Sequence, residues 1–496
     1  MGDMAVAYSR ASTGIHAPLV SVEVHLTRGL PRMTIVGLPA TAVKESKDRV
    51  QSAIINSGFD FPLRKITINL APADLPKQGG RFDLPIALGI LAASKQLNAD
   101  HLKNFECIGE LALSGEIRPA TGVLSFVVGA KLEKKHCIIP MLCANDAHYA
   151  KHEHCYGASH LSEVVSHIQK IHVLTKIIPQ NQAMPSIRCP DMADVQGQPQ
   201  ARRALEIAAS GGHNLLMIGP PGVGKSMLAS RLPIIIPPIE PDQSLTIGQI
   251  HSLHQHGLSP EHWQHPPFRS PHHSISTAAL IGGGNPPTPG EISLAHHGIL
   301  FLDEFNEFQR SAKEALREPL ETGVIHISRA KHSSAFPANF QLIAAINPCP
   351  CGYFNDSSGR CHCTSEQIRK HHAKISGPLL DRIDIKIRLH RINHQLLIQP
   401  KSQEKSAVIR ERTTMARQRQ IKRQQITNAS LGSAELKAHL NLSQAATKYW
   451  LKVSQENASP RALIKWLKIA RTIADLENSS TTECNHLIEA KILQEP

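Results

Sequence analysis

An eight-residue segment constrains the fold of this chain more than any other feature. Residues 219–226 read GPPGVGKS and follow the apolar run LLMI at 215–218. The glycines let backbone N–H groups close around phosphate oxygens, which a Cβ would obstruct. The pattern G-x-x-x-x-G-K-[ST] between a strand and a helix is typical of a phosphate-binding loop, and the helix dipole adds to the attraction. The segment therefore predicts a phosphate-binding α/β core.

The loop also predicts roles for its own side chains. Lys225 is expected to reach the β- and γ-phosphates of a nucleotide, and the Ser226 hydroxyl is expected to bind magnesium. The predicted nucleotide contacts are Gly219, Pro220, Pro221, Gly222, Val223, Gly224, Lys225, Ser226 and, further along the chain, Asp303.

Two later apolar runs end in polar side chains. GILFLDEF (298–305) ends in Asp303 and Glu304, and LIAAINP (342–348) ends in Asn347. Asp303 is predicted to hold the magnesium shell and Glu304 to polarise an attacking water, which hydrolysis needs and binding alone does not. Asn347 is predicted to hold that water or to sense the γ-phosphate. ATP and magnesium are therefore the expected substrate and cofactor.

Two arginines complete this set of candidate catalytic residues. Arg382, in GPLLDRID, is a candidate finger that stabilises transition-state charge across a subunit boundary. Arg461 follows Ser459 and Pro460, which suit the N-cap and first positions of a helix. From that first turn it can reach a phosphate. Spacing alone fits an ordinary salt bridge equally well for each arginine.

A length of 496 residues indicates two or three domains. Residues 1–172 alternate β-branched runs with helix-like ones and predict an α+β domain. Three prolines mark residues 173–192 as a linker, and residues 193–390 continue the α/β pattern as the core. Residues 391–496 are predicted to hold one basic helix, at 403–425, and a helical C-terminal domain. That helix is expected to be a solvated connection, with a direct nucleic-acid contact as the alternative.

Composition narrows the partners and the compartment. Lysine and arginine outnumber aspartate and glutamate by 54 to 41, which favours a polyanion such as DNA, although basic surfaces also serve solubility. The N-terminus does not read as a secretory signal, and no apolar run approaches a membrane span. Ten cysteines without a signal sequence point to a reducing compartment. We expect a cytoplasmic protein with no membrane contact.

Four of those cysteines form the pattern C-x-C-x9-C-x-C, made by Cys349, Cys351, Cys361 and Cys363. Four thiolates on two short turns suit a tetrahedral structural zinc site. C-x-C is tighter than the usual C-x2-C, however, and Pro350 separates the first pair. A reduced, partly buried loop is therefore the alternative to zinc.

Together with VEVHLTRGLP, LAPADLPKQGGRFDLPIALGILAAS, FRSPHHSIS and RALIKWLKIARTIADL, these motifs resemble the ComM (YifB) family, the magnesium-chelatase-like branch of AAA+ ATPases. The resemblance covers nearly the whole chain. It implies a Lon-protease-like first domain, an AAA+ core and a helical lid. It also implies a homo-hexameric helicase that migrates branched DNA during natural transformation, with recombination proteins as further partners. By resemblance, Asn347 is sensor 1, Arg382 the trans-acting finger and Arg461 sensor 2.

The first domain lacks the residues of a Lon-type peptidase. The stretch KQGGRFDLP (77–85) has no serine, and TGVLSF (121–126) has no lysine. With neither nucleophile nor base, peptide hydrolysis has no activation mechanism, so the domain is predicted to be a scaffold. Lys44, Lys77 and Arg81 are predicted either to line a DNA-facing surface or to be solvated charges.

The resemblance also places two pore-facing hairpins, at 277–297 and 324–336. Arg329 and Lys331 lie near the tip of the second, where basic residues suit sequence-independent phosphate contact. Solvated turn residues are the alternative. Aromatic residues make up only 4% of the chain, which favours phosphate tracking over base stacking.

Two other functions use the same ATPase core. A magnesium-chelatase-type subunit for metal insertion needs a separate porphyrin-binding subunit and a metal-binding adhesion domain, for which the sequence shows no segment. A remodelling chaperone needs an aromatic pore loop, which we do not find. An ATP-dependent DNA motor is therefore the leading hypothesis.

Overall fold

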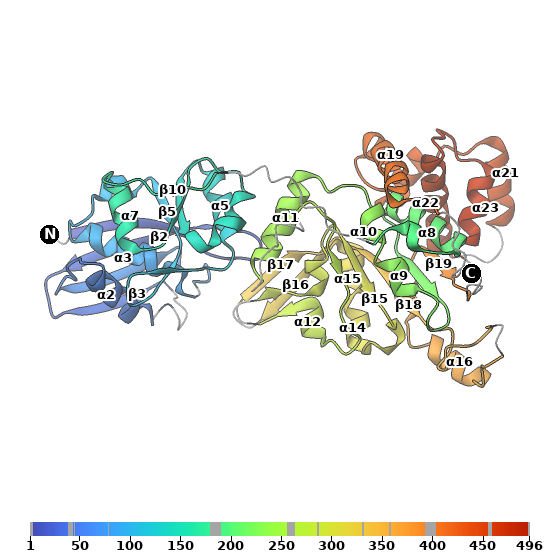
Figure 1. The fold of residues 1–496 in the computed structure, drawn as a ribbon, viewed down its shortest axis with the longest axis horizontal. Helices are drawn as coiled ribbons and strands as arrows, with labels where there is room; N and C mark the ends of the chain where they lie inside the picture. Colours follow the sequence, from blue (N-terminus) through green and yellow to red (C-terminus); the bar gives the residue numbers. More distant parts are fainter. Residues whose placement is uncertain are drawn as a thin grey trace.

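The computed structural model describes residues 3–37, 43, 45–77, 79–178, 190–254, 263–284, 287–329, 332–356, 359–391, 403–454 and 459–494. An α/β domain, a second α/β domain with the phosphate loop, and a helical C-terminal domain follow one another along the chain (Figure 1). The predicted α/β class with a helical C-terminal part is confirmed. Within the described ranges, no helix is long and apolar enough to cross a bilayer.

The first domain is built on an eight-stranded mixed sheet with the order β10-β9-β8-β5-β1-β2-β4-β3. Its strands are β1 (Asp3–Arg10), β2 (Leu19–Thr27), β3 (Arg32–Val36), β4 (Lys65–Ala71), β5 (Phe105–Cys107), β8 (His136–Pro140), β9 (Cys155–Ala158) and β10 (Thr175–Lys176). A separate ribbon pairs β6 (Glu110–Leu111) with β7 (Ile117–Arg118). Because β10 pairs with β9, the sheet continues past the expected boundary at residue 172.

Helices cover this sheet. The longer ones are α2 (Ser46–Asn56), α3 (Asp83–Ala93), α5 (Val123–Leu132) and α7 (Leu161–Ile168). Every residue of α3 is buried, as its uninterrupted apolar sequence predicts. The 3-10 turn η1 (Gly80–Phe82) leads directly into α3.

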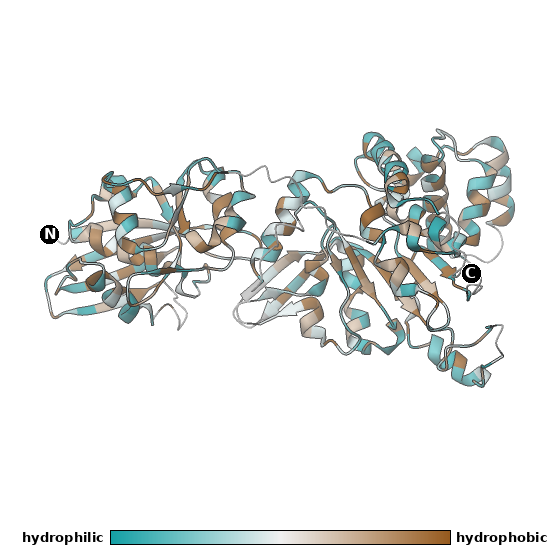
Figure 2. Ribbon diagram, viewed as in Figure 1, coloured by the Kyte–Doolittle hydropathy of each residue, from teal (hydrophilic) through white to brown (hydrophobic). Residues whose placement is uncertain are grey.

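The second domain is built on a five-stranded parallel sheet with the order β12-β15-β18-β11-β19. The strands are β11 (Leu215–Ile218), β12 (Phe268–Arg269), β15 (Ile299–Leu302), β18 (Gln341–Ile346) and β19 (Ile385–Arg388). Every residue of β15 and β18 is buried, as expected for strands covered on both faces, and Figure 2 shows apolar residues along this sheet. Since all strands are parallel, the phosphate loop, Asp303 and Asn347 follow strands that end at the same edge.

Shorter elements surround this sheet. The helices are α8 (Pro199–Gly211), α9 (Lys225–Ala229), α10 (Leu232–Ile235), α11 (Pro241–Ser252), α12 (Thr277–Ile281), α13 (Glu291–Leu294), α14 (Arg310–Ala315), α15 (Arg317–Thr322), α16 (Ser365–His372) and α17 (Gly377–Leu380). Two β-hairpins form where they were expected: β13 (Gly282–Gly283) with β14 (Thr288–Pro289), and β16 (Val324–Arg329) with β17 (His332–Pro337). A Cβ on Gly282 would lie 2.7 Å from Ile327 Cδ1, so the two hairpins pack against each other.

The C-terminal domain contains α19 (Ser406–Gln424), α20 (Ser433–His439), α21 (Gln444–Val453), α22 (Pro460–Leu476) and α23 (Cys484–Ile492). The helix α19 is rich in polar residues (Figure 2), and several of its partly buried arginines contact neighbouring helices. Arg417 donates to the carbonyls of Ala209 and Ser210 in the last turn of α8, at 2.7 and 2.8 Å. The expectation of a solvated helix therefore holds for one face of α19 only, because the face with Ile409, Thr413, Ala416 and Gln420 is buried while the opposite face is exposed.

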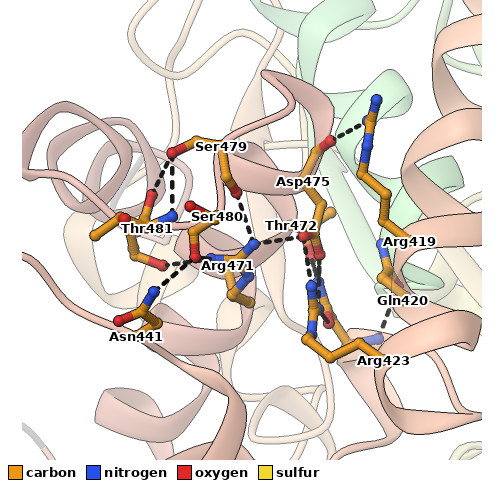
Figure 3. A network of polar contacts seen from close by, with 12 residues as sticks. Arg419, Gln420, Arg423, Asn441, Arg471, Thr472, Asp475, Ser479, Ser480 and Thr481 are labelled. Carbon is orange, nitrogen blue, oxygen red and sulfur yellow. Dashed lines mark hydrogen bonds and ion pairs between the residues drawn. The ribbon is translucent and has the colours of Figure 1, made fainter.

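A second set of contacts joins α19 to α22 (Figure 3). Asp475 is fully buried, and its carboxylate accepts hydrogen bonds from Arg423 at 2.7 and 2.9 Å and from Arg471 at 2.6 Å. Arg423 and Arg471 hold the pKa of Asp475 below its usual value, although burial alone would raise it. These arginines stabilise the helical domain and are not available to a nucleic acid.

The first domain contacts the second directly. The amide of Gly122 donates to the carbonyl of Ser252 in α11 at 2.9 Å. The rings of Tyr149 and Trp263 stack with their centroids 3.9 Å apart. A Cβ on Gly14 would lie 2.8 Å from the carbonyl oxygen of Ala335, so the first domain also touches the β16–β17 hairpin.

Candidate nucleotide site

The phosphate loop connects β11 to α9. Gly222 and Gly224 have φ angles of 76° and 93°, in the left-handed region that only glycine enters without strain. A Cβ on Gly222 would meet no atom within 4 Å, so the loop borders open space there. This backbone is suited to enclose phosphate oxygens.

Lys225 lies at the centre of the site and is only 8% exposed. Its Nζ donates to the carbonyls of Gly219 and Pro220 at 2.6 and 3.1 Å, and to Asn347 Oδ1 at 2.8 Å. Burial lowers the pKa of Lys225, and the nearby Asp303 and Glu304 carboxylates oppose that shift. The structure thus brings together Lys225 and Asn347, which are 122 residues apart. Because Asn347 accepts through Oδ1, its Nδ2 remains available to donate to a phosphate oxygen or a water.

Ser226 and Asp303 are also brought together. The Ser226 hydroxyl donates to Asp303 Oδ2 at 2.6 Å, so a hydroxyl and a carboxylate oxygen lie side by side at the edge of the sheet. Mg²⁺ prefers oxygen ligands and keeps several waters when it binds one or two protein groups next to phosphates. The donor set therefore fits the predicted magnesium ion.

Glu304 follows Asp303 and adopts a left-handed conformation with φ of 51°. Its Oε2 lies 3.2 Å from Nδ1 of His273, which lies between β12 and α12. Sequence analysis did not identify His273. Its only signal was the doubled histidine in FRSPHHSIS, which does not indicate that one ring contacts a carboxylate 31 positions away.

The two candidate arginines lie together, at the opposite edge of the same sheet. Arg382 precedes β19 and Arg461 lies in the first turn of α22; both line a cleft of about 650 Å³ that also includes Asn214, the residue before β11. The four residues of β11 separate this cleft from the phosphate loop, about 13 Å at ~3.3 Å per residue. Both arginines are therefore remote from the phosphate loop of their own chain.

Their contacts within the chain are few. Arg382 forms an ion pair with Glu321 and donates to the Pro378 carbonyl at 2.7 Å. Arg461 is 65% exposed, and its nearest carboxylate oxygen, on Asp381, is 4.0 Å away. The predicted helix start is confirmed, since the Ser459 hydroxyl accepts from the Ala462 amide at 3.2 Å.

The four cysteines form a cluster after Asn347. All four Sγ atoms lie within 4.8 Å of one another. Cys361 Sγ is 3.8 Å from Cys349 Sγ and 3.7 Å from Cys351 Sγ. A zinc ion with four thiolates at ~2.3 Å holds its sulfurs about 3.8 Å apart. Cys349 Sγ and Cys351 Sγ are closer than that, at 3.2 Å, but the set of four gathered sulfurs is compatible with zinc. Hydrogen bonds from the Tyr353 backbone amide and the Cys349 thiol lower the pKa of Cys351 to about 6, whereas burial and hydrogen bonds to the Cys351 sulfur raise the pKa of Cys361 and Cys363.

The remaining basic candidates differ in outcome. Arg329 is the last paired residue of β16, opposite His332. Lys331 and the side chain of Arg329 lie outside the described part of the structure, so their contact with DNA stays a prediction. Lys77 and Arg81 are buried, and Lys77 Nζ donates to the Pro72 carbonyl. The expectation that they are surface residues is wrong, and Lys44 lies outside the described residues.

Comparison with known proteins covers all three domains. The family model "Magnesium chelatase, subunit ChlI" matches residues 191–397, "Subunit ChlI of Mg-chelatase" matches 22–142, and the ChlI C-terminal model matches 403–493. The protein YifB of Salmonella typhimurium is 46% identical over 490 residues, which cover 98% of this chain and 96% of the relative. Competence protein ComM of Haemophilus influenzae is 45% identical over 493 residues, with the same coverage.

A shorter similarity is to the maternal DNA replication licensing factor mcm6 of Xenopus tropicalis, 27% identical over 96 residues, or 19% of this chain and 10% of the relative. The near-full-length matches are sufficient to assign the family. The chain belongs to the YifB/ComM family of magnesium-chelatase-like AAA+ proteins.

Proposed function

We propose that this protein is a magnesium-dependent ATPase that works as a DNA motor. In this proposal it forms a cytoplasmic homo-hexameric ring that promotes branch migration of recombination intermediates during natural transformation. The observation that carries the ATPase part is the convergence of Lys225, Ser226, Asp303 and Asn347 at one edge of the parallel sheet. These side chains follow three separate strands. Together they supply the ammonium, hydroxyl, carboxylate and amide groups that can bind a nucleoside triphosphate and its metal ion.

The chemistry follows from these positions. On binding ATP, Lys225 exchanges two backbone carbonyls for phosphate oxygens, while Asn347 and Glu304 align the attacking water. Glu304 accepts the proton of that water as its oxygen attacks the γ-phosphorus, and ADP leaves. Bound magnesium, held by Ser226 and Asp303, would neutralise charge on the phosphate oxygens. The protein's contribution is positioning and electrostatic stabilisation.

The position of Arg382 and Arg461 supports a ring. Because they lie at the amino edge of the sheet, they suit contact with a nucleotide bound at the carboxyl edge of a neighbouring subunit. Arg382 would then leave Glu321 for the γ-phosphate, and the exposed Arg461 would contact the same nucleotide from the helical domain. Each ATP would lie between two subunits.

Three observations favour DNA as the partner. The chain carries a net charge of +13. A relative identical at 45% of positions is called a competence protein, and the shorter match is to a DNA replication licensing factor. The two packed hairpins, one of which contains Arg329 and Lys331 around its turn, form an element that can track phosphates in a pore.

The first experiment measures ATP hydrolysis with no DNA, single-stranded DNA, duplex DNA and a synthetic four-way junction. We expect stimulation by DNA and ATP-dependent dissolution of the junction. Turnover that no DNA changes would leave an ATPase and overturn the motor. Stimulation by a tetrapyrrole-binding subunit or by an unfolded protein would then favour metal insertion or protein remodelling.

The hairpin tip is tested separately. Arg329→Ala/Lys331→Ala should weaken DNA binding about tenfold and reduce the slope of log affinity against log salt by about two, since each phosphate contact contributes ~0.9. The matched control is Arg32→Ala/Lys65→Ala, an exposed basic pair across β3 and β4 that removes the same charge elsewhere. Equal effects from both variants would contradict a specific role for the hairpin.

A further inference from the structure

A cavity of about 470 Å³ lies between the first domain and the two hairpins of the second. It is separate from the nucleotide site and from the arginine cleft. The first domain contributes the segments 12–14, 74–76, 79–81 and 119–121, and the second contributes Leu253, Pro287, Thr288 and Ser334. Pockets for small ligands commonly enclose ~300–1,000 Å³, so this cavity has a suitable size.

Arg81 lines this cavity and is only 8% exposed. A guanidinium has five N–H donors, yet within the described part of the chain Arg81 makes a single hydrogen bond, from Nη2 to the Thr121 carbonyl at 2.9 Å. Its Nε is buried and has no partner among the described residues. Burial lowers the pKa of Arg81 to about 10.

A buried cation without a counterion is costly, because its lost hydration is not replaced. Two other buried arginines of the described chain meet this cost with a carboxylate. Arg10 donates to the Glu106 carboxylate at 2.6 and 2.9 Å, and Arg471 pairs with Asp475. Arg81 differs from both because its free donors lie beside a cavity.

Thr13 provides a second, independent sign of a ligand. Thr13 also lines the cavity, and its Oγ1 is buried and has no hydrogen-bond partner among the described residues. The hydroxyl-bearing residues Ser12, Thr121, Thr288 and Ser334 form further parts of the wall. Two carboxylates, on Asp74 and Glu110, also line it, and Glu110 lies 3.7 Å from Arg118 Nη1.

We propose that this cavity binds a phosphate group, with the Arg81 guanidinium as its counterion and the Thr13 hydroxyl as a second donor. The planar fork of arginine matches two phosphate oxygens, and hydroxyl groups suit the remaining ones. The phosphate comes either from free inorganic phosphate or from a DNA backbone that passes the adjacent hairpins, since Thr288 and Ser334 belong to β14 and β17. This site is independent of ATP hydrolysis.

Thermal unfolding of the full chain provides the first test. Lys225→Ala is used as the parent, to weaken phosphate binding at the nucleotide loop, and inorganic phosphate is titrated at constant ionic strength against chloride. We expect phosphate to raise the unfolding temperature of the parent. In Arg81→Met the half-saturating phosphate concentration should rise at least tenfold, while the phosphate-free protein should unfold at the same or a higher temperature, because an unpaired buried charge has been removed.

A second test variant and a control variant accompany this experiment. Thr13→Val removes only the hydroxyl and should weaken the phosphate response even if Arg81→Met folds poorly. Arg118→Met removes a positive charge near the cavity from a residue that does not line it, and its response should equal that of the parent.

DNA binding then distinguishes the two sources of phosphate. If Arg81→Met loses the response to phosphate and its DNA salt slope is unchanged, the ligand of the cavity is free inorganic phosphate. A DNA salt slope reduced by about one assigns a backbone phosphate, with or without a response to the free ion. The proposal is overturned if Arg81→Met and Thr13→Val retain the phosphate response of the parent, or if the parent shows none and the DNA slope is unchanged.

Discussion

Glu304 is the residue proposed to accept a proton from the attacking water. Replacing it by glutamine removes the proton acceptor and preserves the shape. Because the phosphate loop, Lys225 and Asp303 remain, Glu304→Gln should still bind ATP, while single-turnover hydrolysis should fall about 10²–10⁴-fold. Fluorescent-nucleotide binding and single-turnover kinetics together check this. Hydrolysis at the parent rate would remove Glu304 from the mechanism.

His273 contacts the Glu304 side chain, with its imidazole Nδ1 3.2 Å from the carboxylate oxygen Oε2. It also precedes α12, which leads directly into the β13–β14 hairpin. We therefore expect DNA at the hairpins to release Glu304. A hydrogen bond is worth ~1 kcal/mol, so His273→Ala should raise DNA-free turnover about fivefold and reduce the stimulation by DNA to the same extent.

His273→Asn serves as the control for this contact, because an asparagine amide can still donate to Glu304. It should keep a DNA-stimulated to DNA-free ratio near that of the parent. If the alanine variant shows the parent ratio as well, the histidine does not control the base.

The helices α19 and α22 are joined through one buried carboxylate, that of Asp475. Asp475→Ala would leave Arg423 and Arg471 without their carboxylate, and breaking a buried pair in this way costs about 3–5 kcal/mol. The fluorescence of Trp450 and Trp466, which lie in the same helical domain, should show a lower urea midpoint. The exposed Glu366–Lys370 pair is the control, because Glu366→Gln should change stability by less than ~1 kcal/mol.

The cysteine loop lies between Asn347, the proposed sensor, and a helix that contacts Asn347. Cys349 follows Asn347 by two residues, and His371 in α16, after the loop, has Nε2 3.0 Å from the Asn347 carbonyl. We expect metal analysis to find about one zinc per chain. Zinc removal by a chelator, or Cys351→Ser, should reduce hydrolysis because Asn347 loses support. Cys484→Ser, remote from the loop, is the control, and a zinc content far below one per chain would exclude the ion.

Most elements were predictable because their signals are local. The strand at 215–218 and the Ser459–Pro460 helix start each depend on neighbouring residues, whereas the two hairpins were expected from the family resemblance. The partners of α19 were not predictable, since Arg417 contacts a carbonyl 207 residues away and Arg423 a carboxylate 52 residues away. His273 and Arg81 were missed or misplaced for the same reason: sequence shows a charge but not what surrounds it.

For the whole molecule, the arrangement of catalytic groups predicts complementation between two inactive variants. Lys225→Ala lacks a working phosphate loop but keeps Arg382, whereas Arg382→Ala keeps the loop. If Arg382 acts on a neighbouring subunit, mixing the two variants should restore hydrolysis at interfaces that combine their intact halves.

The control mixes Lys225→Ala with the double variant Lys225→Ala/Arg382→Ala, in which every phosphate loop is defective, and it should stay inactive. Measuring ATP turnover across mixing ratios gives the answer. If the two variants are shown to assemble together and the mixture is still inactive, Arg382 does not act in the nucleotide site of its neighbour.

The separation of the phosphate loop from Arg382 and Arg461 also has a consequence for how the protein responds to dilution. In the proposed ring a lone chain would carry two unmatched halves of different sites, so its turnover should depend on meeting another copy. Mass action then makes turnover per chain rise with protein concentration until rings are complete. If the proposed ring is correct, the amount of protein that a cell makes would therefore set how much ATP each chain consumes.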